Sequence, residues 1–83
     1  MVTRSKKAEK QFYDLVNSRG DVKKKLIRFS ENPRMELDAH KLKGKLAGKW
    51  SCYLGNNIRM VYEIDDINKE IIVVAVGSHK VYG

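Results

Sequence analysis

The sequence predicts an α+β fold in which an N-terminal helical hairpin packs on a small antiparallel sheet of three to four strands. Three observations lead to this prediction. The first half of the chain contains two segments with helical apolar spacing, the second half contains three segments typical of strands, and the whole chain has 83 residues. Because this length suits one domain, we expect residues 1–83 to form a single unit.

Composition narrows the class of protein. Hydrophobic residues make up 42% of the chain and charged residues 33%, which favours a packed core over disorder. The longest apolar run, residues 71–76, is far shorter than the roughly 20 residues that cross a bilayer, and residues 1–7 do not resemble a signal peptide. A single cysteine, Cys52, and two histidines offer too few ligands for a zinc site. We therefore expect a cytoplasmic protein with no membrane contact, metal or cofactor.

Two helices are predicted in the first half. The first begins after Ser5, a suitable N-cap, and its apolar stripe repeats at helical spacing. This stripe consists of Ala8, Phe12, Leu15 and Val16. The second follows a turn at Gly20, with Asp21 as its cap, and ends at Asn32, because the residue before Pro33 disfavours a helix. Its apolar stripe consists of Val22, Leu26 and Phe29.

Three strands are predicted in the second half. Residues 50–54 and 58–65 are rich in β-branched and aromatic residues and flank a Gly-Asn-Asn turn, and residues 70–76 form a third, largely apolar run. The two large aromatics Trp50 and Tyr62 fit or border the inward alternation, so we assign them to the core.

Alternation predicts which side chains share a face of the sheet. Counting by twos places the following residues under the helices: Ile58, Met60, Tyr62, Ile64, Ile72, Val74 and Val76. Arg59 and His79 then lie on the opposite, helix-free face. Because Arg59 begins its strand and His79 follows the end of an adjacent antiparallel strand, we expect them at the same end of the sheet, beside the small residues Ala75 and Gly77.

Positive charge is concentrated in the first 50 residues. This half has 14 basic and 6 acidic side chains, whereas residues 51–83 have 3 and 4. The segment HKLKGKLAGK, residues 40–49, carries four lysines and no acid, and its two glycines allow the backbone to approach a ligand. Such a surface is typical either of a solubilising face or of a face that meets nucleic-acid phosphates, and the clustering favours the second.

These residue types suit metal-independent cleavage of RNA. The 2'-OH next to the scissile phosphate is a nucleophile within the substrate. Catalysis then needs a base, a cation that stabilises the transition state and an acid that protonates the leaving 5'-oxygen. Histidine suits the acid and arginine the cation, while tyrosine stacks on bases and a lysine near other cations can accept a proton.

The segments LKGKLAGKWSCYLGNNIRMVYEID and VVAVGSHKVYG resemble the RelE/ParE superfamily of toxins, specifically its mRNA interferase branch. The resemblance covers residues 3–83 and is strongest from Lys41. It implies a RelE-like toxin of a type II toxin-antitoxin module that cuts mRNA in the ribosomal A site, with the ribosome and a cognate antitoxin as partners. Members usually open with a strand of about six residues, so here the first strand is expected to be short or absent.

The resemblance also implies roles for individual residues. Arg59 matches the arginine that contacts the scissile phosphate, His79 the proposed general acid and Tyr82 the aromatic that orients the base. Lys43, with Lys41, matches basic residues of the loop, and Lys43 is our fourth candidate catalytic residue. The candidate RNA-binding residues are His40, Lys41, Lys45 and Lys49.

Two other functions stay open at this point. A ParE-like member of the superfamily would inhibit DNA gyrase, although such members typically lack the arginine, histidine and aromatic set. A non-catalytic RNA-binding domain would keep its RNA affinity without His79. The residue that acts as general base is not assigned, because no carboxylate stands at the expected position.

Overall fold

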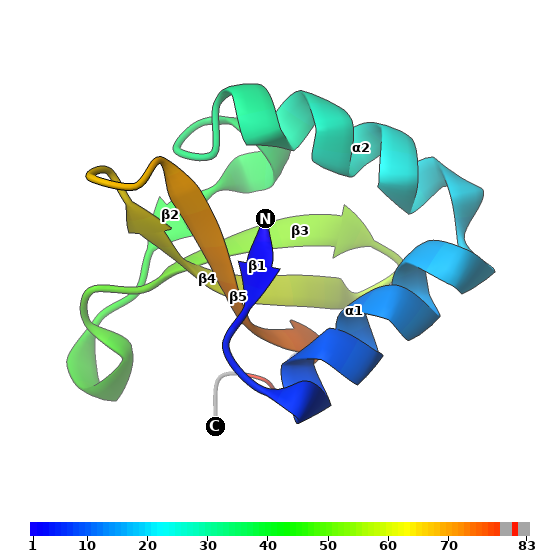
Figure 1. The fold of residues 1–83 in the computed structure, drawn as a ribbon, viewed down its shortest axis with the longest axis horizontal. Helices are drawn as coiled ribbons and strands as arrows, with labels where there is room; N and C mark the ends of the chain where they lie inside the picture. The colour runs from blue at the N-terminus through cyan, green and yellow to red at the C-terminus, as the bar shows by residue number, and fades with distance from the viewer. Residues whose placement is uncertain (79–80, 82–83) are drawn as a thin grey trace.

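The computed structural model describes residues 1–78 and 81, which form two helices and a five-stranded sheet of order β1-β5-β4-β3-β2 (Figure 1). In chain order the elements are β1 Val2–Thr3, α1 Lys6–Ser18, α2 Gly20–Glu31, the 3-10 turn Glu36–Asp38, β2 His40–Lys41, the 3-10 turn Gly44–Leu46, β3 Trp50–Gly55, β4 Ile58–Asp65 and β5 Glu70–Gly77. The α+β class and the order of the main elements are as predicted.

Both helices form where the apolar spacing placed them. The Ser5 hydroxyl accepts a hydrogen bond from the Ala8 backbone N–H at 3.1 Å, so it caps α1 as expected. The predicted cap of α2 is wrong: the helix already begins at Gly20, and Asp21 instead forms an ion pair with Arg19 at 2.7 Å. Among the described residues, neither helix combines the length and apolar character needed to cross a membrane.

The sheet is larger than predicted and mixed in direction. Strands β3, β4 and β5 form the expected antiparallel meander. Two strands of two residues each extend it: β1 pairs in parallel with β5, and β2 pairs antiparallel with β3. The first strand is short, as predicted, because the chain begins α1 immediately after the Ser5 cap. Strands this short carry too few residues for an alternation pattern, which explains why three to four strands were expected.

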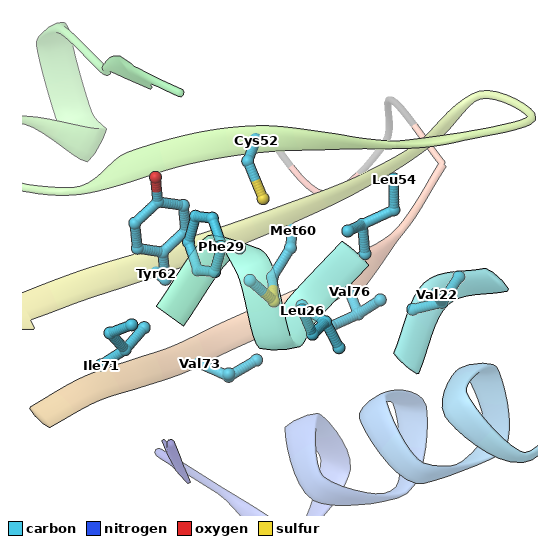
Figure 2. Packing of buried hydrophobic residues seen from close by; sticks show 10 residues of the cluster. All are labelled: Val22, Leu26, Phe29, Cys52, Leu54, Met60, Tyr62, Ile71, Val73 and Val76. Carbon is cyan, nitrogen blue, oxygen red and sulfur yellow. The ribbon is translucent and has the colours of Figure 1, made fainter. Parts of the chain in front are cut away.

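The hydrophobic core lies between the helices and one face of the sheet (Figure 2). Its buried members are Val22, Leu26, Phe29, Cys52, Leu54, Met60, Tyr62, Ile71, Val73 and Val76. Phe29 and Tyr62 meet edge to face with ring centroids 5.0 Å apart. The Tyr62 hydroxyl donates a hydrogen bond to the Pro33 carbonyl at 2.6 Å, which ties the end of α2 to the sheet. Tyr62 is fully buried as expected, while Trp50 packs at the border of the core and is half-buried.

A β-bulge in β5 changes the predicted assignment of faces. Val61 pairs with Ala75, but the next residue, Tyr62, pairs with Val73, so β5 contains one extra residue, Val74, at this point. Before the bulge, Ile71 and Val73 face the helices. The prediction that Ile72 and Val74 do so is therefore wrong, because counting by twos assumes an uninterrupted strand. After the bulge the prediction is right, and Val76 belongs to the core.

Candidate functional site

Three residues form a row across the helix-free face. Tyr53 of β3 pairs with Arg59 of β4, and Arg59 pairs with Gly77 of β5. Directly paired residues of antiparallel strands place their side chains on the same face, so Tyr53 and Arg59 lie together beside a position without a side chain. The next pair on the same face, Ser51 and Val61, is buried, with exposed fractions of 0% and 1%. The row of Tyr53, Arg59 and Gly77 lies at one end of this face.

The guanidinium of Arg59 stacks on an aromatic ring and has one buried nitrogen without a partner among the described residues. Its Cζ atom lies over the Tyr53 ring, 4.3 Å from the centroid. Its Nη1 atom is buried and has no hydrogen-bond partner within residues 1–78 and 81. Burying a polar donor without a partner is unfavourable, and buried polar atoms are rarely left so in folded proteins. Arg59 therefore retains donor capacity for an anion.

Ser78 and Val81 follow β5 and lie at the same end of the sheet. Strand β5 ends at Gly77, and the Val81 backbone N–H donates to the Ser78 carbonyl at 3.0 Å. A Cβ atom on Gly77 would lie 3.1 Å from a methyl group of Val81, so Val81 packs closely on the end of the strand. His79 and Tyr82 lie outside the described residues. Because the strand has ended, alternation no longer assigns a face to His79, and its place beside Arg59 stays a prediction.

The lysine-rich segment forms a closed loop between β2 and β3. The Leu42 backbone N–H donates to the Lys49 carbonyl at 2.9 Å, and the loop turns through Gly44 and Gly48 with φ of +68° and +89°. Lys43 and Lys45 are exposed on it. The two glycines therefore adopt the left-handed conformation, which glycine reaches at little steric cost.

His40 shares the helix-free face but lies away from Arg59. It pairs with Ser51 in β2, at the edge of the sheet, and its Nδ1 lies 3.0 Å from the Asp38 carbonyl oxygen. From standard strand spacing, two strands across and two residues along, the Cα atoms of His40 and Arg59 are about 12 Å apart. The two residues therefore do not belong to one cluster.

A second group of cations surrounds Trp50. Arg34 Cζ and Lys41 Nζ lie 5.9 Å and 5.7 Å from the centroid of its ring. Together with Lys49 they line a hollow of about 320 Å³ that has no acidic residue in its wall. Arg34 is also held by Asp66, with contacts of 2.8 Å and 2.9 Å. Of the predicted RNA-binding lysines, Lys41 and Lys49 come together here, while Lys45 does not line the hollow.

Arg19, between the two helices, holds the tip of the β3–β4 hairpin. Its guanidinium donates to the carbonyls of Leu54 and Gly55 at 3.0 Å and 3.2 Å. The same group holds the pKa of Asp21 below its ordinary value through a side-chain hydrogen bond. The tip itself contains three consecutive residues with positive φ, residues 55–57. The end of the sheet that carries Arg59 is therefore fixed to the helices.

Cys52 is a buried, free thiol in the hydrophobic core. Burial raises the pKa of the Cys52 thiol to about 12, which keeps it protonated. Within residues 1–78 and 81, no group of three or more histidine, cysteine or acidic side chains is placed to hold a metal ion.

Sequence reasoning missed Tyr53, Arg34 and Arg19. A signal for Tyr53 existed, because counting outward from the Gly-Asn-Asn turn pairs residue 53 with residue 59. Arg34 and Arg19 reach their partners across 16 and 36 residues of sequence respectively, for which a single sequence carries no signal.

No model of a protein family and no curated protein matches this sequence. Solved structures do match. A metal-bound toxin from Helicobacter pylori is 26% identical, with a TM-score of 0.72, and the match covers 100% of this chain and 98% of that one. The YoeB-YefM complex from Staphylococcus aureus contains a chain that is 23% identical, with a TM-score of 0.73, and the match covers 94% of this chain and 93% of that one.

A variant of YafQ from E. coli in which a histidine is replaced by glutamine is 15% identical, with a TM-score of 0.69 and coverage of 98% of this chain and 93% of that one. These proteins have the same arrangement of two helices on a sheet over nearly their full lengths. The chain therefore has the fold of the RelE/ParE toxin superfamily, as its sequence motifs predicted.

Proposed function

We propose that the protein is the toxin of a type II toxin-antitoxin module and that it cleaves mRNA bound in the ribosomal A site. The observation that carries the proposal is Arg59, a cation with a buried and unpartnered nitrogen at one end of the helix-free face. Structural neighbours that are named as toxins support the same class.

The state of Arg59 in the structure supports the chemistry that we assign to it. A guanidinium keeps its charge at every physiological pH and presents donors in a planar fork that matches phosphate oxygens. In RNA cleavage by the 2'-OH, negative charge grows on the phosphate in the transition state. Among the residues described, no carboxylate forms an ion pair with Arg59, so its charge is not neutralised before substrate binds.

The remaining roles complete a metal-independent reaction. The substrate 2'-oxygen attacks phosphorus, the bond to the 5'-oxygen breaks, and His79 gives its proton to that leaving oxygen, which yields a 2',3'-cyclic phosphate. Tyr82 orients the neighbouring base. A general base, not assigned to a residue, takes the proton of the 2'-OH. Lys43 is the remaining candidate catalytic residue.

RNA binding is supported by the basic surface at the other edge of the sheet. The loop lysines and the hollow around Trp50 present several cations, of which Arg34 is paired with Asp66, and such a basic surface suits the phosphate backbone of mRNA or ribosomal RNA. His40 lies about 12 Å from Arg59 by strand geometry, roughly two nucleotides along an extended strand.

A small acidic antitoxin is the proposed protein partner. One structural neighbour is a chain of the YoeB-YefM complex, described as a toxin-antitoxin complex from Staphylococcus aureus. The net charge of +7 on this chain favours a partner of opposite charge.

The experiment is inducible expression of the wild type, Arg59→Ala and His79→Ala in bacteria, followed by primer extension on an abundant mRNA. We expect new 5' ends with the wild type and a loss of at least about 100-fold in each variant, the size typical of removing one transition-state donor. Arg28→Ala, which removes an exposed helix arginine, is the matched control and should cleave like the wild type.

The alternatives give different results in the same cells. Growth arrest with intact mRNA and loss of plasmid supercoiling would indicate a gyrase inhibitor. RNA binding by the purified protein that is unaffected in His79→Ala, without any cleavage, would indicate a non-catalytic RNA-binding domain. Either result overturns the proposed endonuclease.

A further inference from the structure

Tyr53 is the aromatic residue in contact with Arg59, and nothing so far gives it a function. It is paired with Arg59 across the β3–β4 ladder, and 36% of its surface is exposed. The distance of 4.3 Å from the Arg59 Cζ to the ring centroid lies well within the range of a cation–π interaction. The Tyr53 ring therefore packs against the Arg59 guanidinium.

The other surroundings of Arg59 do little to hold its side chain. Gly77, its partner on β5, has no side chain. Within the described part of the chain, the guanidinium forms no ion pair, and its Nη1 has no hydrogen-bond partner. A long arginine side chain loses considerable rotamer freedom when it is fixed, so its position has to be stabilised by some contact. The ring of Tyr53 is the contact that the structure shows.

Tyr53 is itself held in place. The Asn57 backbone N–H lies 3.5 Å from the Tyr53 hydroxyl oxygen, at the limit of a hydrogen bond. The hairpin tip beyond Tyr53 is tied to the helices by the bonds from Arg19 to the carbonyls of Leu54 and Gly55. The ring is thus attached to a fixed part of the sheet rather than to a free loop.

We propose that Tyr53 is a positioning residue that holds the Arg59 guanidinium in place for a phosphate. This proposal rests on the proposed function of Arg59. An aromatic ring suits the task because it attracts the cation through its quadrupole without neutralising it. A carboxylate at the same position would fix the arginine more strongly but would compete with the phosphate. The ring, not the hydroxyl, is the necessary part.

The first test measures the position of Arg59 without any cleavage assay. In the purified protein, the Arg59 Nε–Hε resonance is followed by NMR in the wild type, Tyr53→Phe and Tyr53→Leu. We expect a ring-current shift in the wild type and in Tyr53→Phe, and its loss in Tyr53→Leu. Addition of inorganic phosphate should move the resonance at lower concentrations in the two proteins with a ring. An Arg59 resonance that is the same in Tyr53→Leu as in the wild type would overturn the proposal.

The second test separates positioning from binding in ribosome-dependent cleavage. Tyr53→Leu should lower kcat by about tenfold, the size of an ordinary cation–π interaction, with little change in KM, and Tyr53→Phe should restore it. In the Arg59→Ala background, Tyr53→Leu should have no further effect. Tyr13→Leu, at an exposed tyrosine of α1, is the matched control.

The two arms distinguish this proposal from the proposed function. If the wild type does not cleave RNA, the proposed function fails, and the NMR arm alone decides whether Tyr53 positions Arg59. If the wild type cleaves but Tyr53→Leu retains full kcat, Tyr53 has no positioning role. Far-UV circular dichroism of each variant identifies any that fails to fold, and for such a variant Tyr53→Trp, which keeps an aromatic ring, provides the deciding comparison with the wild type.

Discussion

On the helix-covered face of the sheet, the buried hydroxyl of Tyr62 donates to the Pro33 carbonyl at 2.6 Å and the apolar side chains pack without exposure. On the opposite face, a buried nitrogen of Arg59 has no partner among the described residues, and an exposed tyrosine lies against it. The two faces belong to the same three strands, yet the Tyr62 hydroxyl has a partner and the Arg59 Nη1 has none in residues 1–78 and 81. Such a local violation of a packing rule is expected where function requires it.

The largest effect on stability is expected from a substitution in the core, between the helices and the sheet. Phe29 is 0% exposed and contacts Tyr62 edge to face. Phe29→Ala should lower the free energy of unfolding by about 3–5 kcal/mol, because it leaves a cavity in a small core. Urea unfolding followed by circular dichroism measures the change. Ile27→Ala, at a position 61% exposed on the same helix, should cost no more than about 0.5 kcal/mol. Equal costs would show that the core is not where the structure places it.

Alkaline pH should lower the stability of the folded protein through Cys52, which belongs to the same core. Burial raises the pKa of this thiol from an ordinary value of 9.0 to about 12. The unfolded chain then loses a proton that the folded chain keeps, so stability is full below pH 9 and falls as pH rises towards 12. At about 1.36 kcal/mol per pKa unit, the loss from this group approaches about 4 kcal/mol. Urea unfolding from pH 8 to 11.5 should show a steeper fall for the wild type than for Cys52→Ala. Parallel curves would contradict the assignment.

How far the sequence predicted the fold depends on whether a feature is periodic. Apolar residues recur over two or more turns in each helix and over several residues in each of the three long strands. The positions of these elements were therefore predicted to within about two residues. The two-residue strands β1 and β2 have no pattern to read. The bulge at Val74 is also invisible to alternation, because one extra residue reverses the face of every residue on one side of it.

The candidate site was predicted only in part for the same reason. The face of Arg59 follows from the regular strand β4, and its neighbour Gly77 was placed correctly because the count began beyond the bulge. Without the bulge, pairing outward from the four-residue turn between β4 and β5 would set Val76 opposite Arg59, on the helix-free face. The extra residue therefore both keeps Val76 in the core and brings Gly77 to the site.

A smaller loss of stability is expected from a substitution at the tip of the β3–β4 hairpin. Gly55 has φ of +88°, and an added Cβ would lie 3.0 Å and 3.1 Å from the side-chain nitrogens of Arg19 and Lys25. Those side chains can move, but the left-handed backbone remains costly, so Gly55→Ala should lose about 1–2 kcal/mol in urea unfolding. Gly20→Ala, in the first turn of α2 with nothing within 4 Å of the new methyl group, should be neutral or stabilising. A reversed order would show that the tip is not held as described.

The smallest change in stability is expected from the side chain with the largest proposed role. Arg59→Met keeps the length of the side chain, removes the unpartnered Nη1 and should leave the free energy of unfolding unchanged or slightly higher. The matched variant Arg19→Met removes a guanidinium that donates to Leu54 and Gly55, and should destabilise by about 1–2 kcal/mol.

If Arg59→Met and Arg19→Met lower the free energy of unfolding by the same amount, Arg59 is a structural residue. The proposed difference between the two faces of the sheet is then wrong. If Arg59→Met is neutral for stability while primer extension detects no cleavage, the helix-free face carries a cation that folding does not need. A residue that is needed for cleavage and contributes nothing to stability is a binding or catalytic group rather than a structural one.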